Sequence, residues 1–175
     1  MEYEKIAAGG IVKCNEKEGV IGAVIKYKGK KCILTVYHLI KVGNCDLGDI
    51  IKVWEFNGRI IEIIMEYDLF IAEIYAPSPC FEFSKLDKPE IGPAYALKGG
   101  FKNNCNIMTT GKIYHYLSFA PRFIPLHGDS GSPIIQKGML LGFLLLFFII
   151  MPLELQYLLN HSLIIILNKF ASNWA

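Results

Sequence analysis

The chain has 175 residues, of which 53% are hydrophobic and 19% are charged, and 18 basic against 16 acidic residues give a formal net charge of +2. This composition excludes a disordered chain and supplies a core for one domain or for two closely joined halves. Because the charge is nearly balanced and the basic residues are scattered, we expect no nucleic-acid partner.

The first half of the chain predicts strands, since short segments rich in Val, Ile, Tyr and Phe alternate with glycine-bearing turns. The KGK segment at 28–30 predicts one hairpin turn, and Asn57–Gly58 predicts another because Asn-Gly is the strongest short hairpin signal. The expected strands are 19–27, 31–40, 48–56, 59–66 and 68–75.

A loop containing Pro77, Pro79 and Pro89 is the best candidate for a boundary between two halves. Beyond it the sequence predicts further strands, and the fold class is all-β, a barrel or a sandwich. Only residues 162–175 favour a helix, with Asn160 or Ser162 as N-cap, although their Ile and Leu content also allows a strand. The expected strands of this half are 94–99, 105–119, 132–148 and 153–159.

Residues 139–153, MLLGFLLLFFIIMPL, are intensely apolar and end near Pro152 and Glu154. The run is shorter than the roughly 18–20 apolar residues that a membrane-spanning helix needs. We therefore expect a buried strand and no membrane span. A membrane-associated protein with residues 139–167 in lipid stays open as an alternative.

The five cysteines show no paired spacing, no CxxC motif is present, and no group of histidines and cysteines has the spacing of a zinc site. We therefore expect no metal and no cofactor, and reduced, mostly buried thiols. The N-terminal MEYEKIAAGG lacks the apolar region of a signal peptide, so the expected location is the cytoplasm. The cysteines are Cys14, Cys32, Cys45, Cys80 and Cys105.

The polar loop at 125–135, PLHGDSGSPII, carries the residues best suited to chemistry. Glycines on both sides of the Asp-Ser pair let the backbone turn sharply and approach a substrate. The hydroxyl of Ser130 is a weak nucleophile that needs a neighbouring base, and attack on a carbonyl needs N–H donors for the developing oxyanion. A glycine-rich turn capped by Asp129 and Ser132 is the simpler alternative.

Two further residues could serve that serine. His38 stands at the end of the apolar segment CILTVYHL, where a structural histidine with a backbone hydrogen bond is the alternative. Asp68 stands at the start of a strong strand, where strand propensity disfavours an acid and a turn cap is the alternative. A carboxylate that orients an imidazole needs such a placement.

Taken together, three segments resemble the histidine, aspartate and serine motifs of the chymotrypsin/trypsin-like serine proteases, in the same order: LTVYH at His38, YDLFIAEI at Asp68 and GDSGSP at Ser130. The resemblance covers most of the chain and is closest to the compact bacterial high-temperature-requirement type, without a peptide-binding domain. It implies two Greek-key, six-stranded antiparallel β-barrels with a short C-terminal helix. Residues 1–80 would form the first barrel and residues 81–175 the second.

The same resemblance implies a role for each residue. Ser130 would be the nucleophile, His38 the general base, and Asp68 the group that orients the imidazole. The backbone N–H groups of Gly128 and Ser130 would form the oxyanion hole. The substrate would be a polypeptide with an apolar or small side chain on the acyl side of the cleaved bond. The residues expected to contact it are Ile124, His127, Leu145, Leu146 and Phe147.

The chain departs from the family pattern near the histidine and in the serine loop, where Ser132 replaces the usual second glycine of G-D-S-G-G-P. Leu39 follows His38, so the disulfide that animal members place beside this histidine is not expected. Asp129 would be buried and would need a counter-charge, for which Arg122 is the first candidate and Lys112 the second.

Two alternatives within the resemblance stay open. Bulky side chains at Tyr37 and Phe147 allow a protease fold that binds a partner without cleaving it. The small size of the chain also allows a viral or self-processing protease.

Overall fold

The computed structural model describes residues 4–110, 114–120, 122, 125, 126, 128–145 and 161–166. These residues form short strands and very little helix. The elements are β1 (Ile11–Cys14), β2 (Lys17–Val20), β3 (Ala23–Tyr27), β4 (Lys30–Val36), α1 (Tyr37–Val42), β5 (Ile50–Val53), β6 (Phe56–Ile64), η1 (Met65–Tyr67), β7 (Leu69–Ile74), η2 (Ser78–Cys80), β8 (Gly92–Lys98), β9 (Phe101–Thr110), β10 (Tyr114–Phe119), β11 (Pro133–Gln136), β12 (Met139–Leu145) and β13 (His161–Ile166).

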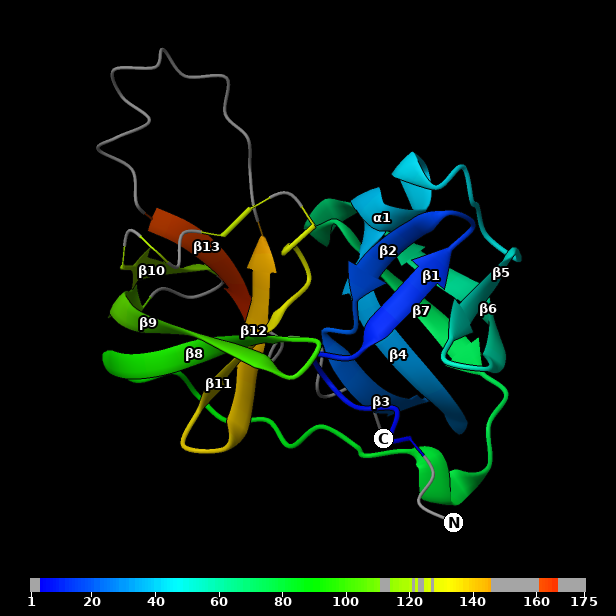
Figure 1. Cartoon of the computed structure of the whole chain (residues 1–175), viewed down its shortest axis with the longest axis horizontal. Coiled ribbons are helices and arrows are strands. Elements are labelled where there is room, and N and C mark those ends of the chain that lie inside the picture. Colours follow the sequence, from blue (N-terminus) through cyan, green and yellow to red (C-terminus); the bar gives the residue numbers. More distant parts are fainter. Residues whose placement is uncertain are drawn as a thin grey trace.

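The strands form two antiparallel sheets that lie side by side (Figure 1). The first is seven-stranded in the order β2-β1-β5-β6-β7-β4-β3, and the second is a closed barrel in the order β10-β13-β12-β11-β8-β9. The all-β double-barrel fold class is therefore confirmed. The first sheet has one strand more than the six that the resemblance implies, because β1 and β2 form an additional hairpin. The expected strand 19–27 is divided between the end of β2 and β3. Strands β1 and β2 have only four residues each, and β2 begins with the charged pair Lys17 and Glu18, so the strand pattern is weak. Asn15 turns the hairpin with a φ of 52°.

One of the two predicted hairpin turns is confirmed and the other is wrong. Between β3 and β4, Lys28 and Gly29 have φ values of 49° and 76°, the paired positive values of a tight hairpin turn. Between β5 and β6, the chain turns at Trp54 instead of Asn57–Gly58. Gly58 lies inside β6, where a Cβ would come within 2.4 Å of Ile74 Cδ1, so this glycine permits close strand packing.

The predicted helix at 162–175 is wrong over its first part, since residues 161–166 form β13 and pair with β10 and β12 to close the barrel. The run of Leu and Ile suits a strand better than a helix. Residues 167–175 and the predicted strand at 153–159 lie outside the described residues.

The apolar segment predicted as a buried strand begins as β12, between β11 and β13. The side chains of Leu140, Leu141, Phe143 and Leu144 in this strand are all at most 2% exposed. None of the helices among the described residues has the length and hydrophobicity of a membrane-spanning segment. Residues 146–153 of the segment lie outside the described residues.

The two sheets pack directly on each other. Phe143 of β12 is fully buried within the apolar core of the first sheet. Opposite it lies Gly22, where a Cβ would come within 2.4 Å of the Phe143 ring and 3.0 Å of the Leu34 carbonyl oxygen. Glycine at this position therefore lets the second barrel approach the backbone of the first.

Backbone hydrogen bonds from two further segments join the sheets. The Gly9 N–H donates to the Ile21 carbonyl at 2.7 Å, and the Gly9 carbonyl accepts from the Gly99 N–H at 2.8 Å. The connection between the sheets runs along one side of both (Figure 1), and Ser84 N–H bonds to the Val24 carbonyl on the way. The division at residues 80 and 81 falls in this connection and stays a prediction.

Two of the cysteines form a disulfide, Cys14–Cys45, so the prediction of unpaired thiols is wrong for this pair. A sequence separation of 31 gives no local spacing signal. Cys32, Cys80 and Cys105 are free and buried, and burial raises the pKa of the Cys32 and Cys105 thiols to about 12. The cytoplasmic location stays a prediction, and the disulfide removes one of its two arguments.

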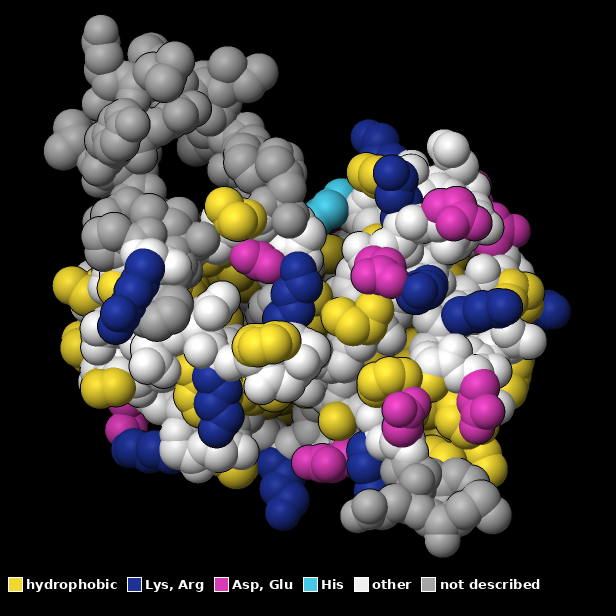
Figure 2. Space-filling view, in the orientation of Figure 1, with side chains coloured by type: hydrophobic (Ala, Val, Ile, Leu, Met, Phe, Trp, Pro, Cys, Tyr) yellow, Lys and Arg dark blue, Asp and Glu magenta, His cyan; other side chains and the backbone are white. Residues whose placement is uncertain are grey.

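Charged side chains of both signs are interspersed on the face shown in Figure 2. Several form exposed ion pairs, such as Lys13 with Glu18 at 2.8 Å. Exposed pairs of this kind contribute little to stability, because water and salt screen their charges. The fold therefore depends mainly on its two apolar cores and on the disulfide.

We expect the double variant Cys14→Ser/Cys45→Ser to lower the free energy of unfolding by about 3–4 kcal/mol, because the unfolded chain loses the closed loop. Urea unfolding measures this change. A dithiol reductant should lower the stability of the wild-type protein to that of the variant and leave the variant unchanged. An equal effect of the reductant on both proteins would contradict the assignment.

His115 of β10 is 2% exposed, and burial lowers the pKa of its imidazole, partly offset by a hydrogen bond to the Thr109 backbone. Below the ordinary value of 6.5 the unfolded chain binds the proton first. Stability contributed by the neutral imidazole is therefore lost as the pH falls from 6.5 toward the lowered pKa. Unfolding midpoints at pH 7.5 and 5.5 should differ more in the wild-type protein than in His115→Gln, and equal differences would contradict this.

Candidate active site

His38 is the second residue of α1, directly after the buried strand β4. The sequence predicted a strand as far as residue 40, but the chain leaves the sheet after Val36. Leu39 and Ile40 turn inward from the helix and are buried. The histidine side chain is left at the edge of the first sheet, with 42% of its surface exposed.

Asp68 makes three hydrogen bonds to the start of α1. Its backbone carbonyl accepts from Tyr37 N–H at 2.7 Å, and its carboxylate Oδ1 accepts from His38 N–H at 3.0 Å. The second carboxylate oxygen, Oδ2, lies 2.6 Å from His38 Nδ1. Because an ionised carboxylate only accepts, Nδ1 carries the proton, and Nε2 of a neutral imidazole is then an acceptor.

The backbone of Asp68 is left-handed, with a φ of 54°, where η1 ends and β7 begins. Aspartate tolerates this conformation better than most residues, which accounts for an acid at the start of a strong strand. The turn-cap alternative from the sequence is thus partly right, since Asp68 does end a helical turn. Its carboxylate contacts His38 rather than capping its own turn.

Ser130 lies in a tight loop between Gly128 and Gly131, which have φ values of 91° and 89°. Hydrogen bonds within and next to the loop fix its shape: Ser132 N–H donates to the Asp129 carbonyl at 3.1 Å, and Gly131 N–H to a carbonyl of β12 at 2.8 Å. Ser130 is 7% exposed. The positive φ values explain the two glycines, because residues with a side chain rarely adopt them.

The serine loop packs against the end of β4, across the boundary between the sheets. A Cβ on Gly131 would come within 2.8 Å of Thr35 Oγ1 and 3.0 Å of the Val20 carbonyl oxygen. The Thr35 hydroxyl itself donates to the Val20 carbonyl at 2.5 Å. Gly131, next to Ser130, therefore contacts Thr35, which is three positions before His38.

The cation on Asp129 is Lys98, the last residue of β8. Lys98 Nζ donates to Asp129 Oδ1 at 2.9 Å, and the second carboxylate oxygen accepts from Leu126 N–H at 2.7 Å. The predicted partners of Asp129 are Arg122 and Lys112, and the sequence did not indicate this lysine. A strand end 31 residues away carries no local signal that it will approach the loop, and Lys112 lies outside the described residues.

The expected substrate contacts fall almost entirely outside the described residues. Ile124, His127, Leu146 and Phe147 are not among them, and of Leu145 only the backbone, at the end of β12, is described. The pocket therefore stays a prediction. In the portion of the chain that the structure describes, no three His, Cys, Asp or Glu side chains are grouped as metal ligands.

Comparisons in sequence and in structure give different results. No protein-family model and no curated protein matches the sequence. Solved structures do match: the Nocardiopsis protease NAPase at 10% identity and a TM-score of 0.71, covering 97% of this chain and 96% of that one. Protease A of Thermobifida fusca follows at 10% identity, a TM-score of 0.69 and coverage of 96% and 95%.

A third match is a glutamic acid specific serine protease that uses a histidine triad in substrate binding, at 9% identity, a TM-score of 0.64 and coverage of 95% and 96%. These likenesses extend over nearly the full length of each chain. The protein has the double β-barrel fold of the trypsin-like serine proteases.

We expect Lys98→Met to lower the free energy of unfolding by about 1–2 kcal/mol, because it leaves the Asp129 carboxylate, 19% exposed, without its cation. Chemical denaturation measures the change. Lys98→Arg should retain most of the stability. Lys102→Met, in the same hairpin, is the matched control, and a loss as large as that of Lys98→Met would contradict a specific ion pair.

Proposed function

We propose that the protein is a serine endopeptidase in which Ser130, His38 and Asp68 act as a catalytic triad. The observation that carries the proposal is the His38–Asp68 pair, held by two hydrogen bonds to one carboxylate. The packing of the Ser130 loop on Thr35 supports it, because it brings the loop to the strand that leads into His38.

In the proposed reaction, Ser130 Oγ attacks the carbonyl carbon of a peptide bond while its proton passes to His38 Nε2. The tetrahedral intermediate then breaks its C–N bond, and the imidazolium gives that proton to the leaving amine. Water attacks the resulting ester with His38 again as base. The carboxylic acid leaves, and Ser130 recovers its proton.

Asp68 is proposed to orient the imidazole and to stabilise the imidazolium. The tautomer with a proton on Nδ1 fits this role, because Nε2 is then free to accept the serine proton. The His38 side chain is 42% exposed and that of Asp68 29%, so the pair is open on one side, as access for a polypeptide requires.

The N–H groups of Gly128 and Ser130 are proposed to bind the oxyanion. Support comes from the fixed shape of the loop, in which Lys98 and Leu126 N–H hold the Asp129 carboxylate. One donor in such a hole typically contributes about 3–4 kcal/mol to transition-state stabilisation. We further propose an apolar or small side chain on the acyl side of the cleaved bond, with Ile124 and residues 145–147 lining the pocket.

A fluorophosphonate probe tests the proposal, since it reacts with a serine only when a neighbouring base activates the hydroxyl. We expect one modified residue, Ser130, mapped by mass spectrometry, and no modification in Ser130→Ala or His38→Ala. If the wild-type protein stays unlabelled, the result would instead support the alternative of a protease fold that binds a partner without cleaving it.

Asp68→Asn should lower the rate of labelling by up to about 10⁴-fold, because the amide no longer favours the required imidazole tautomer. Glu66→Gln is the matched control, because this exposed side chain lies two residues away and loses the same charge. Equal effects of the two substitutions would show that the negative charge around residues 66–68, and not the contact of Asp68 with His38, controls the labelling rate.

A further inference from the structure

The helix that carries His38 is too short to be stable alone. Helix α1 has six residues and no side-chain hydrogen bond at its N-cap. Isolated helices shorter than about 12–15 residues are marginal in water. Its geometry therefore depends on what holds its two ends, and Asp68 holds the first through Tyr37 and His38.

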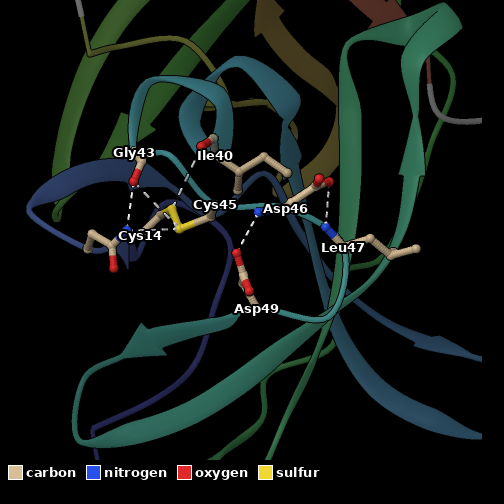
Figure 3. The surroundings of a disulfide bond; sticks show 8 residues. Cys14, Ile40, Gly43, Cys45, Asp46, Leu47 and Asp49 are labelled. Atoms are coloured by element: carbon tan, nitrogen blue, oxygen red, sulfur yellow. Dashed lines mark hydrogen bonds between the residues drawn. A yellow bond between two sulfur atoms is a disulfide. The ribbon is translucent and has the colours of Figure 1, made fainter.

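The Cys14–Cys45 disulfide holds the other end (Figure 3). Cys45 N–H donates to the Ile40 carbonyl at 2.8 Å, so Cys45 is part of the helix terminus. Gly43, at the C-cap, lies against Cys14, where a Cβ would come within 2.6 Å of the sulfur. The disulfide thus ties the end of α1 to the end of β1.

We propose that this disulfide is a redox-sensitive tether that regulates the candidate active site: its reduction releases the end of α1, loosens the His38–Asp68 pair and slows the reaction of Ser130. This inference rests on the proposed function. The disulfide acts here as a positioning device, because neither cysteine contacts His38 in any hydrogen bond described above.

The exposure of the two sulfurs decides how a reductant reaches the bond. Cys14 is fully buried, whereas Cys45 is only partly buried. A thiolate of an external dithiol attacks Cys45 Sγ, the S–S bond breaks, and the electron pair leaves on Cys14, which takes up a proton. The second thiol of the reductant then displaces Cys45, so that two cysteine thiols and one oxidised dithiol result.

The surroundings also accommodate the reduced form. Cys14 Sγ lies 4.0 Å from the Ile40 carbonyl oxygen, and Cys45 Sγ lies 3.8 Å from that of Gly43 (Figure 3). Each new S–H donor therefore has an acceptor within reach. The bond between Asn15 Nδ2 and the Gly43 carbonyl at 2.7 Å does not depend on the disulfide.

Contacts that survive reduction make the expected effect partial. Leu39 of α1 packs against Gly19 of β2, where a Cβ would come within 2.3 Å of its side chain. We therefore expect the helix to stay in place but to be held less accurately. A misplacement of about 1 Å can cost about 100-fold in rate, so reduction should slow labelling by about 10- to 100-fold.

The experiment equilibrates the full chain in dithiothreitol buffers of increasing reducing strength, counts new thiols by alkylation and mass spectrometry, and measures the rate of fluorophosphonate labelling. The rate should fall together with the appearance of two thiols. Cys14→Ser/Cys45→Ser should label at the low rate in every buffer, and Cys80→Ala, which removes a free buried thiol, should respond like the wild-type protein.

An unchanged labelling rate after both thiols have appeared would overturn the inference. If neither the oxidised nor the reduced protein is labelled, the proposed function fails. Hydrogen exchange of the His38 and Cys45 backbone amides then tests separately whether reduction releases α1. Faster exchange of these amides on reduction would support release of α1, and unchanged exchange would overturn it.

Discussion

The geometry around His38 depends first on Asp68, which holds the start of α1. Asp68 has a left-handed backbone at the end of η1. Its carbonyl accepts from Tyr37 N–H, and its carboxylate contacts the backbone N–H and the ring Nδ1 of His38. The orientation of the imidazole is therefore set through backbone positions of β7 and α1, and very little is left to side-chain rotation. Such a constraint fixes Nδ1 as a donor and leaves Nε2 of the neutral imidazole as an acceptor.

The second constraint is the close approach of the two sheets, which occurs where side chains are absent. Gly22 receives Phe143 of the second barrel, and Gly131 receives Thr35 of the first. A methyl group at either position would force backbone or ring atoms apart, because protein interiors are close-packed. These contacts set the distance between the Ser130 loop and the His38 helix. The geometry of the candidate site therefore depends on how the two cores pack.

Much of the fold and the pairing of His38 with Asp68 could be predicted from the sequence, because strand pattern, glycine turns and three motifs are local signals. Several of the errors concern contacts between distant residues. Asn57–Gly58 has the local form of a turn, but Gly58 is needed for packing against Ile74. Pairing of Cys14 with Cys45, and of Lys98 with Asp129, depends on strands whose neighbours no local pattern reveals.

The pairing order of the second barrel has a consequence for the growing chain. Strand β13 lies between β10 and β12, so the barrel around Ser130 cannot close before residues 161–166 have left the ribosome. All strands of the first sheet end by Ile74 and can pair long before that. A nascent chain can therefore bring the imidazole of His38 and the carboxylate of Asp68 together before the barrel that carries Ser130 closes.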